Sequence, residues 1–259
     1  MISIFRRVQE LYEEGRPAAL CTVVQSAGST PQKPGARMIV YPDGSIEGTV
    51  GGGALEMRVI EEARKVIETG ESHLIPIELR EHQPHSVGGV CGGEMTVFVE
   101  KIGTWPRLLI LGGGHVGQTL SRMAAELPLQ IVVYDDREEY ADPERFPPGV
   151  KTVYGPFENA METLQPTSQD YIAIMTYKYT LDELLVKAAV NTPAKYIGMI
   201  GSEMKCRRVR DDLTDQGVPK EKLDRVHAPI GIEIGAHTPP EVAVSILGEI
   251  VQVMNGMKS

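Results

Sequence analysis

One stretch of this chain runs from a short apolar segment directly into three glycines, and it constrains the fold more than any other feature. Residues 107–111 read Arg-Leu-Leu-Ile-Leu, which is typical of a buried strand. The glycines at Gly112, Gly114 and Gly117 then match a G-x-G-x-x-G frame. In that frame the missing side chains permit a tight turn, close approach of the backbone to a phosphate and close packing of the next helix. The pattern predicts a Rossmann-like unit.

A second apolar run, residues 129–134, strengthens this interpretation because Asp135 follows it. A carboxylate at that place binds the ribose of a dinucleotide in Rossmann domains. Gly113 and His115 complete the glycine loop, and His115 either donates to a bound phosphate or serves only as a polar residue at a helix start. A glycine turn that merely lets a helix pack is the alternative, since glycine makes up 27 of the 259 residues.

The rest of the chain predicts an α/β protein with two domains. Further strands at 152–154, 171–176 and 196–200 alternate with helical stretches, as a doubly wound parallel sheet requires. Upstream, predicted helices at 1–15 and 54–68 accompany five strand-like segments, at 18–25, 36–41, 46–50, 73–79 and 95–101. We therefore expect an N-terminal α+β domain at 1–105 and a Rossmann-like domain at 106–259, divided at the Gly103-Thr-Trp-Pro106 break.

Three helix starts carry recognisable signals. Thr180 and Thr238 each precede a glutamate by three residues, so both predict a capping box. Gly201 and Ser202 follow the apolar run at 196–200, and Ser202 is expected to cap a helix that contains Lys205 one turn further on. This would point a helix N-terminus at the carboxyl edge of the sheet, where ligands of such folds bind.

The composition excludes several classes of protein. A net charge of −9 and a pI near 5.3 argue against a general binder of nucleic acid or anionic membranes. The three cysteines are too few and too scattered for a disulfide framework, which suits a cytoplasmic location. We expect neither a secretion signal nor a membrane span, because no apolar run approaches the required length.

A second glycine segment resembles the first in design. Gly51, Gly52 and Gly53 follow a strand-like run and precede a helix, so their amides could hold an anion. Glu56 lies in the first turn of that helix, where an acidic residue is favoured with or without a ligand. The preceding segment 28–37 adds hydroxyls and the cations Lys33 and Arg37, although its Gly-Ser-Thr-Pro run is also an ordinary turn.

Cys91 stands between two pairs of glycines, so a ligand could approach its sulfur closely. A thiolate there could bind a soft metal or take part in sulfur chemistry, and a small buried side chain is the alternative. His82 and His85 precede it, but their spacing lacks the paired frame of zinc sites, and we expect no protein-bound metal. No catalytic triad or Cys-His pair at motif spacing is present in the sequence.

Together, these motifs resemble the XdhC/CoxI family of accessory factors for xanthine dehydrogenase and related molybdenum hydroxylases. The resemblance covers almost the whole chain, and the order of its motifs is more specific than any one of them. It rests on Gly28-Ser-Thr-Pro31, Pro34-Gly-Ala36, Gly51-Gly-Gly-Ala-Leu-Glu56, Cys91-Gly-Gly93, Gly112-Gly-Gly-His-Val-Gly117, Asp135-Asp-Arg137, Tyr196-Ile-Gly-Met-Ile-Gly-Ser202 and Pro229-Ile-Gly-Ile-Glu-Ile-Gly-Ala-His-Thr-Pro239.

The resemblance implies a cytoplasmic homodimer that binds molybdenum cofactor, a molybdopterin, protects its sulfurated form and inserts it into an apo xanthine dehydrogenase-type hydroxylase. It also implies a setting in purine catabolism and a cysteine desulfurase as a further partner. Carried over by position, Gly51 to Gly53, Glu56 and Cys91 would contact the cofactor. Gly112 to Gly117 and Asp135 would line the Rossmann cleft.

One departure and two alternatives remain open. Relatives commonly have a histidine after the strand at 171–175, whereas this chain has Tyr177, which does not titrate near neutral pH. The glycine loop with Asp135 also fits an NAD(P)-dependent oxidoreductase, in which the Rossmann cleft holds a nucleotide. A third possibility is a noncatalytic subunit of the hydroxylase itself.

Overall fold

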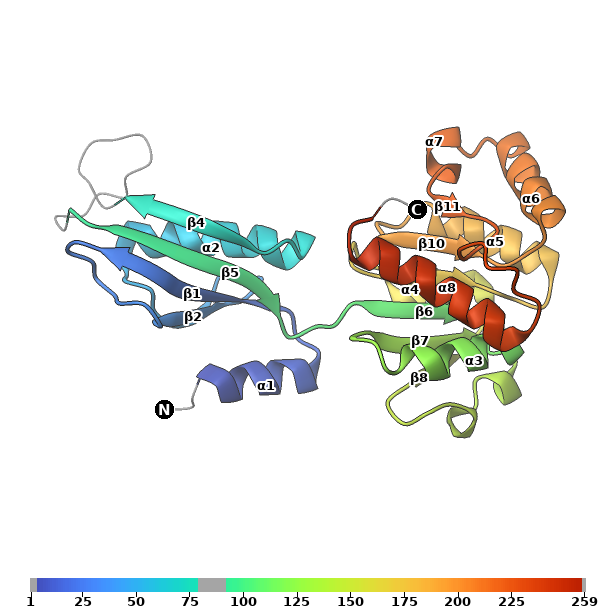
Figure 1. Ribbon diagram of the computed structural model, residues 1–259, viewed down its shortest axis with the longest axis horizontal. Helices are drawn as coiled ribbons and strands as arrows, with labels where there is room; N and C mark the ends of the chain where they lie inside the picture. Colours follow the sequence, from blue (N-terminus) through green and yellow to red (C-terminus); the bar gives the residue numbers. More distant parts are fainter. Residues whose placement is uncertain (1–3, 79–91, 258–259) are drawn as a thin grey trace. The chain divides into compact units, whose positions relative to one another are not determined.

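The computed structural model describes residues 4–78 and 92–257 and divides the chain into two compact units, Met1–Trp105 and Pro106–Ser259 (Figure 1). Within these described residues each unit has its own sheet, with five antiparallel strands in the first and six parallel strands in the second. The expected combination of an α+β domain and a doubly wound parallel sheet is confirmed.

The N-terminal unit is an antiparallel sheet with the strand order β3-β2-β1-β5-β4. Its strands are β1 (Ala18–Ala27), β2 (Arg37–Val40), β3 (Ile46–Gly48), β4 (His73–Glu78) and β5 (Glu94–Ile102), and its helices are α1 (Ile4–Glu14) and α2 (Gly53–Thr69). Side chains alternate between the two faces of a strand, so each face has its own apolar cluster. Cys21, Val23 and Met38 pack against α2, whereas Leu20 and Ile39 pack against Leu11 of α1.

The C-terminal unit is a parallel sheet with the order β11-β10-β9-β6-β7-β8. Its first half contains β6 (Arg107–Leu111), α3 (His115–Ala124), β7 (Gln130–Asp135), β8 (Lys151–Tyr154) and α4 (Ala160–Leu164), with short 3₁₀ turns at Glu138–Tyr140, Pro143–Arg145 and Phe157–Asn159. Its second half contains β9 (Tyr171–Ile174), α5 (Tyr179–Ala189), β10 (Tyr196–Met199), α6 (Glu203–Asp215), α7 (Lys220–Leu223), β11 (Val226–His227) and α8 (Pro239–Met254).

Both faces of this parallel sheet are covered, as the continuous apolar runs of its strands require. Along β6, Leu108 and Ile110 face the cluster of α3 and α8, whereas Leu109 and Leu111 face that of α5 and α6. Figure 1 shows α8 lying across the first of these faces, where it packs against α3. The two crossover directions diverge between β6 and β9, which is the switch point where ligands of such sheets bind.

The helix-start signals have different outcomes. Thr238 forms the expected capping box with Glu241, and Ser202 caps α6 by accepting from the amide of Lys205. The capping box at Thr180 is wrong, because α5 begins at Tyr179 and Lys178 precedes it without a side-chain cap.

Candidate functional site

Two sequence-distant motifs of the N-terminal unit meet without side chains between them. Ser29 forms a parallel bridge with Gly92, and a Cβ on Gly28 would lie 3.2 Å from the Cα of Gly93. A Cβ on Gly93 would lie only 2.3 Å from the carbonyl oxygen of Ser29, so only glycine fits at this position. The turn after β1 and the segment before β5 therefore form one backbone surface.

The second glycine segment joins the same surface. A Cβ on Gly51 would lie 2.6 Å from the Pro31 ring, so this glycine packs directly against the Gly-Ser-Thr-Pro turn. Gly51, Gly52 and Gly53 have φ values of 141°, 79° and 61°, a succession of left-handed conformations that strongly favours glycine. Three of the predicted motifs thus converge at one place, which we call the glycine surface: Gly28–Pro31, Gly51–Gly53 and Gly92–Gly93.

An internal carboxylate already occupies the amides of the second glycine segment. Oε1 of Glu56 accepts from the amides of Val50, Gly51 and Gly52 at 3.1, 3.2 and 2.9 Å, and also from the hydroxyl of Thr49. Burial alone would raise the pKa of Glu56, but these hydrogen bonds outweigh it and lower the pKa. An external anion can reach the same amides only by displacing Glu56.

The cysteines and the arginine of the N-terminal unit differ in how they relate to the glycine surface. Cys91 lies outside the described residues, although its sequence neighbour Gly92 belongs to the glycine surface. The Arg37 guanidinium donates to the carbonyl of Gly35 and lies 4.7 Å from the Phe5 ring, so it is engaged within its own unit. Cys21 is fully buried, which raises its pKa to about 12 and leaves it inert.

In the glycine loop of the Rossmann unit, the protein's own backbone fills the space left by three of the four glycines. A Cβ on Gly112 would lie 2.3 Å from the Met175 carbonyl oxygen at the end of β9, and one on Gly113 would lie 2.1 Å from the Tyr140 oxygen. A Cβ on Gly117 would lie 2.0 Å from the Gly112 oxygen. These glycines therefore serve the packing of the loop, whereas Gly114 faces open space and precedes the exposed His115.

Asp135 is fully buried and its carboxylate is already bound on both oxygens. Oδ2 accepts from the amide of Gly113 at 2.8 Å and from the Arg137 guanidinium, while Oδ1 accepts from the Arg137 amide and Nε. The guanidinium contacts two aromatic rings, 3.7 Å from the centroid of Tyr140 and 4.1 Å from that of Tyr177. A ribose would have to compete with these internal partners.

Tyr177 also donates to Asp136 at 3.0 Å, so it closes this cluster from the end of β9. The role of Arg137 was missed in the sequence, where only its place beside Asp135 was visible. An arginine two residues after a buried aspartate is the available signal, because its backbone and side chain can both reach that carboxylate.

Gly201 and Ser202 lie beside a second buried ion pair at the same edge of the sheet. Asp182 is fully buried and accepts from Thr176 and, at 2.5 Å, from Nζ of Lys205. Lys205 also donates to the carbonyl of Ile200. This network joins the ends of β9 and β10 to α5 and α6, and sequence spacing gave no signal for the contact between Asp182 and Lys205.

Comparison with known proteins identifies the family to which this chain belongs. The sequence pattern of the XdhC Rossmann domain matches residues 108–250, and that of the XdhC and CoxI family matches residues 11–78. The chain belongs to the XdhC and CoxI family. The two patterns fall in the Rossmann unit and in the unit that carries the glycine surface, respectively.

Three relatives show how far the similarity extends. The chain is 36% identical over 255 residues to the Uncharacterized protein YqeB of Escherichia coli (strain K12), covering 98% of this chain but 47% of that protein, so it spans about half of this relative's length. It is 23% identical to a probable xanthine dehydrogenase subunit of Bacillus subtilis (strain 168), covering 93% and 94% of the two chains. It is also 23% identical to the Molybdenum cofactor insertion chaperone PaoD of Escherichia coli (strain K12), covering 97% and 88%.

A solved structure supports the fold alone. A xanthine dehydrogenase from Bacillus halodurans is similar over 100% of this chain and 97% of its own, with a TM-score of 0.55 and 20% sequence identity.

Within residues 4–78 and 92–257, no helix is long and apolar enough to cross a membrane. The same part of the chain contains no group of three or more His, Cys, Asp or Glu side chains that could hold a metal ion.

Proposed function

We propose that this protein binds molybdenum cofactor, protects its sulfurated form and inserts it into an apo xanthine dehydrogenase-type molybdenum hydroxylase. Membership of the XdhC and CoxI family supports this proposal. The similarity to a molybdenum cofactor insertion chaperone supports it further, because the two proteins match over most of both chains. The cofactor is a cargo here, so the protein needs a surface that holds it and releases it.

The observation that carries the proposal is the convergence at the glycine surface. Gly52, Gly53 and Gly92 leave open space where a side chain would stand, which lets a flat polar pterin approach backbone N–H and C=O groups closely. The amides of Val50, Gly51 and Gly52 are arranged for an anion, as their bonds to Glu56 demonstrate. We propose that the cofactor's phosphate exchanges with the Glu56 carboxylate at these amides, and that Cys91 contacts the sulfur or molybdenum end.

The Rossmann cleft supports a dehydrogenase less well. Asp135, the residue expected to bind a dinucleotide ribose, is fully buried and bound by Gly113 and Arg137. The rings of Tyr140 and Tyr177 both pack on that guanidinium. We therefore propose that the Rossmann unit acts mainly as a scaffold and that its cleft binds no NAD(P) or other nucleotide tightly. The residues that would contact a weakly bound ligand in this cleft are the glycine loop, His115 and Ser202.

An anaerobic titration with molybdenum cofactor tests the proposal directly. Bound pterin is followed by its fluorescence after oxidation, with and without excess NAD. We expect saturable binding that NAD fails to displace and that Cys91→Ala weakens at least about tenfold. Cys21→Ala is the matched control, because Cys21 is buried in the core. Absence of pterin binding together with tight NAD binding would overturn the carrier and favour an oxidoreductase.

A noncatalytic subunit is the second candidate, because one relative is named a probable xanthine dehydrogenase subunit. Co-purification with the hydroxylase in a fixed ratio would favour this second candidate, whereas transient association that ends after cofactor loading would favour the carrier. The proposed homodimer and the proposed cysteine desulfurase partner are checked in the same preparations by light scattering and by pull-down.

A further inference from the structure

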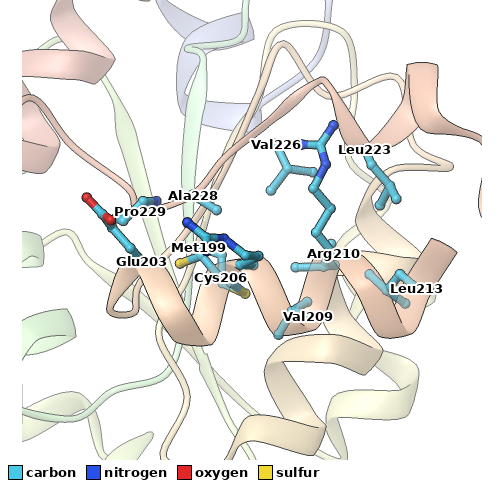
Figure 2. Close-up of a pocket in the computed structure, with 12 residues that line it drawn as sticks. Met199, Glu203, Cys206, Val209, Arg210, Leu213, Leu223, Val226, Ala228 and Pro229 are labelled. Atoms are coloured by element: carbon cyan, nitrogen blue, oxygen red, sulfur yellow. The ribbon is translucent and has the colours of Figure 1, made fainter. Parts of the chain in front are cut away.

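A cavity of about 340 Å³ lies in the Rossmann unit between α6 and the outer edge of the sheet (Figure 2). Its volume falls at the lower end of the range of small-molecule sites. It lies beside β10 and β11, whereas the glycine loop follows β6, and β9 separates the two halves. The cavity is therefore distinct from the cleft at the switch point.

Most of the side chains that line the cavity are apolar, and they come from several elements. β11 is only two residues long, so the sheet edge is short where α6 and α7 pass over it. The lining side chains without a charge are Val186, Met199, Cys206, Val209, Leu213, Leu223, Val226, Ala228 and Pro229. Burial raises the pKa of the Cys206 thiol, so it contributes to the wall as a neutral, apolar group.

Charged side chains line this cavity along one face of α6. Glu203, Arg207 and Arg210 follow each other at spacings of four and three residues, which places them on the same side of a helix. Arg210 reaches towards Val226 and Leu223 and forms an ion pair with Asp224 (Figure 2). Arg207 is exposed, and no described residue forms an ion pair or hydrogen bond with its side chain.

We propose that this cavity binds a small amphipathic anion, with its apolar body between α6 and the sheet and its acidic group on Arg207. The apolar walls select the body of the ligand, and the unpaired guanidinium selects a carboxylate, sulfonate or phosphate. Glu203 in the first turn of α6 disfavours the anion and sets a limit on affinity. This inference does not depend on the proposed function, since it uses only residues of the Rossmann unit.

The test uses the full chain and 8-anilinonaphthalene-1-sulfonate, an aromatic anion whose fluorescence rises in apolar surroundings. We expect saturable binding with one site per chain. Arg207→Gln should weaken it about fivefold, the scale of one exposed charge pair, and Glu203→Gln should strengthen it. Ala228→Phe should abolish it, because Ala228 is an exposed lining residue whose enlargement fills the cavity without entering the core.

Arg208→Gln is the matched control. Arg208 is adjacent in sequence but does not line the cavity, and its guanidinium lies 5.3 Å from the Tyr179 ring. Unchanged near-ultraviolet circular dichroism shows that each variant is folded. Equal weakening by Arg207→Gln and Arg208→Gln, or full binding by a folded Ala228→Phe, would overturn the proposal, as would the absence of saturable binding to the wild-type chain.

Discussion

At the scale of single residues, Glu56 determines the state of the amides that an anionic ligand would use. Its carboxylate accepts four hydrogen bonds from the loop that leads into α2, so those donors are satisfied when no cargo is bound. Leaving buried amides without an acceptor is costly. Glu56 therefore holds Gly51 and Gly52 in their left-handed conformations, and a displacing anion finds them already in place.

Replacing Glu56 by glutamine should measure this contribution. The variant retains one carbonyl oxygen but loses the charge, and we expect a loss of about 1–2 kcal/mol in the free energy of unfolding at pH 7. Because the fold lowers the Glu56 pKa from 4.5, its stabilisation is complete above that value and is lost as the pH falls through the lower pKa of the folded state. Urea denaturation of Glu56→Gln and wild type between pH 7 and pH 3 should show the difference shrinking below pH 4.5.

Glu61→Gln provides the control, since Glu61 lies exposed on the same helix. Its effect on unfolding should stay below about 0.5 kcal/mol at every pH. Equal losses in the two variants would show that the charge of α2, rather than the contact with the glycine amides, accounts for the effect.

In the Rossmann unit, as at Glu56, a predicted ligand-binding group is already bound by the protein itself, and the residues concerned are Asp135 and Tyr177. The sequence placed Asp135 where a ribose-binding carboxylate belongs, but its neighbour Arg137 supplies three donors and Gly113 a fourth. The Tyr177 ring packs on that guanidinium, with its centroid 4.1 Å away. Tyr177 therefore supplies an aromatic contact to the guanidinium rather than a group that titrates near neutral pH.

At the scale of secondary-structure elements, the approach of α3 to β6 depends on one glycine. Gly117 lies in the first turn of α3, and a Cβ there would lie 2.0 Å from the carbonyl oxygen of Gly112. Gly114 precedes the same helix with a φ of −65° and open space where its Cβ would be. Position 114 therefore has space for a side chain, whereas position 117 has none.

This difference predicts opposite tolerances for the same substitution. Gly117→Ala forces α3 away from the strand and should cost about 3 kcal/mol or more in the free energy of unfolding. Gly114→Ala should cost less than about 1 kcal/mol, the scale of a changed helix cap. Thermal denaturation of the two purified variants checks this, with soluble yield as the readout where Gly117→Ala fails to fold. Similar melting temperatures for both would contradict the packing argument.

Local signals explain which elements could be predicted from the sequence. The apolar run at 107–111 and the following glycines define β6 and α3, because their pattern depends on neighbouring residues only. Thr238 and Glu241 form their capping box for the same reason. At α5, by contrast, Asp182 of the expected capping segment faces Thr176 and Lys205, and a contact with a residue on α6 has no local pattern.

The glycine surface could be predicted only in part for the same physical reason. Each glycine segment was visible, but the contacts of Gly28 with Gly93 and of Gly51 with Pro31 depend on strand pairing across the unit. The bonds from the loop amides to Glu56 depend on backbone geometry that residue types alone do not fix. The cavity beneath α6 had no sequence signal, because it results from how several elements pack around a two-residue strand.

At the scale of the whole molecule, each unit contains its own apolar clusters. Among the residues that the structure describes, the clusters of the N-terminal unit draw on residues up to Ile102, and those of the Rossmann unit begin at Leu108. Trp105, the last residue of the first unit, packs at a tilt on Tyr12, with the two ring centroids 5.0 Å apart. Each unit also has the size of an ordinary domain. We therefore propose that residues 1–105 and 106–259 fold as independent domains with separate ligands.

Separate expression of the two fragments tests this division and the position of the cargo site together. All described residues of the glycine surface lie in 1–105, so this fragment should unfold cooperatively in calorimetry and retain pterin binding within about threefold of the full chain. Fragment 106–259 should bind no pterin but should keep the anilinonaphthalene sulfonate site, whose lining lies between Val186 and Pro229. That second binding event shows that the fragment is folded, so its failure to bind pterin is informative. A folded fragment 1–105 without pterin binding would contradict the assignment of the cargo to the glycine surface, while leaving the two-domain division intact.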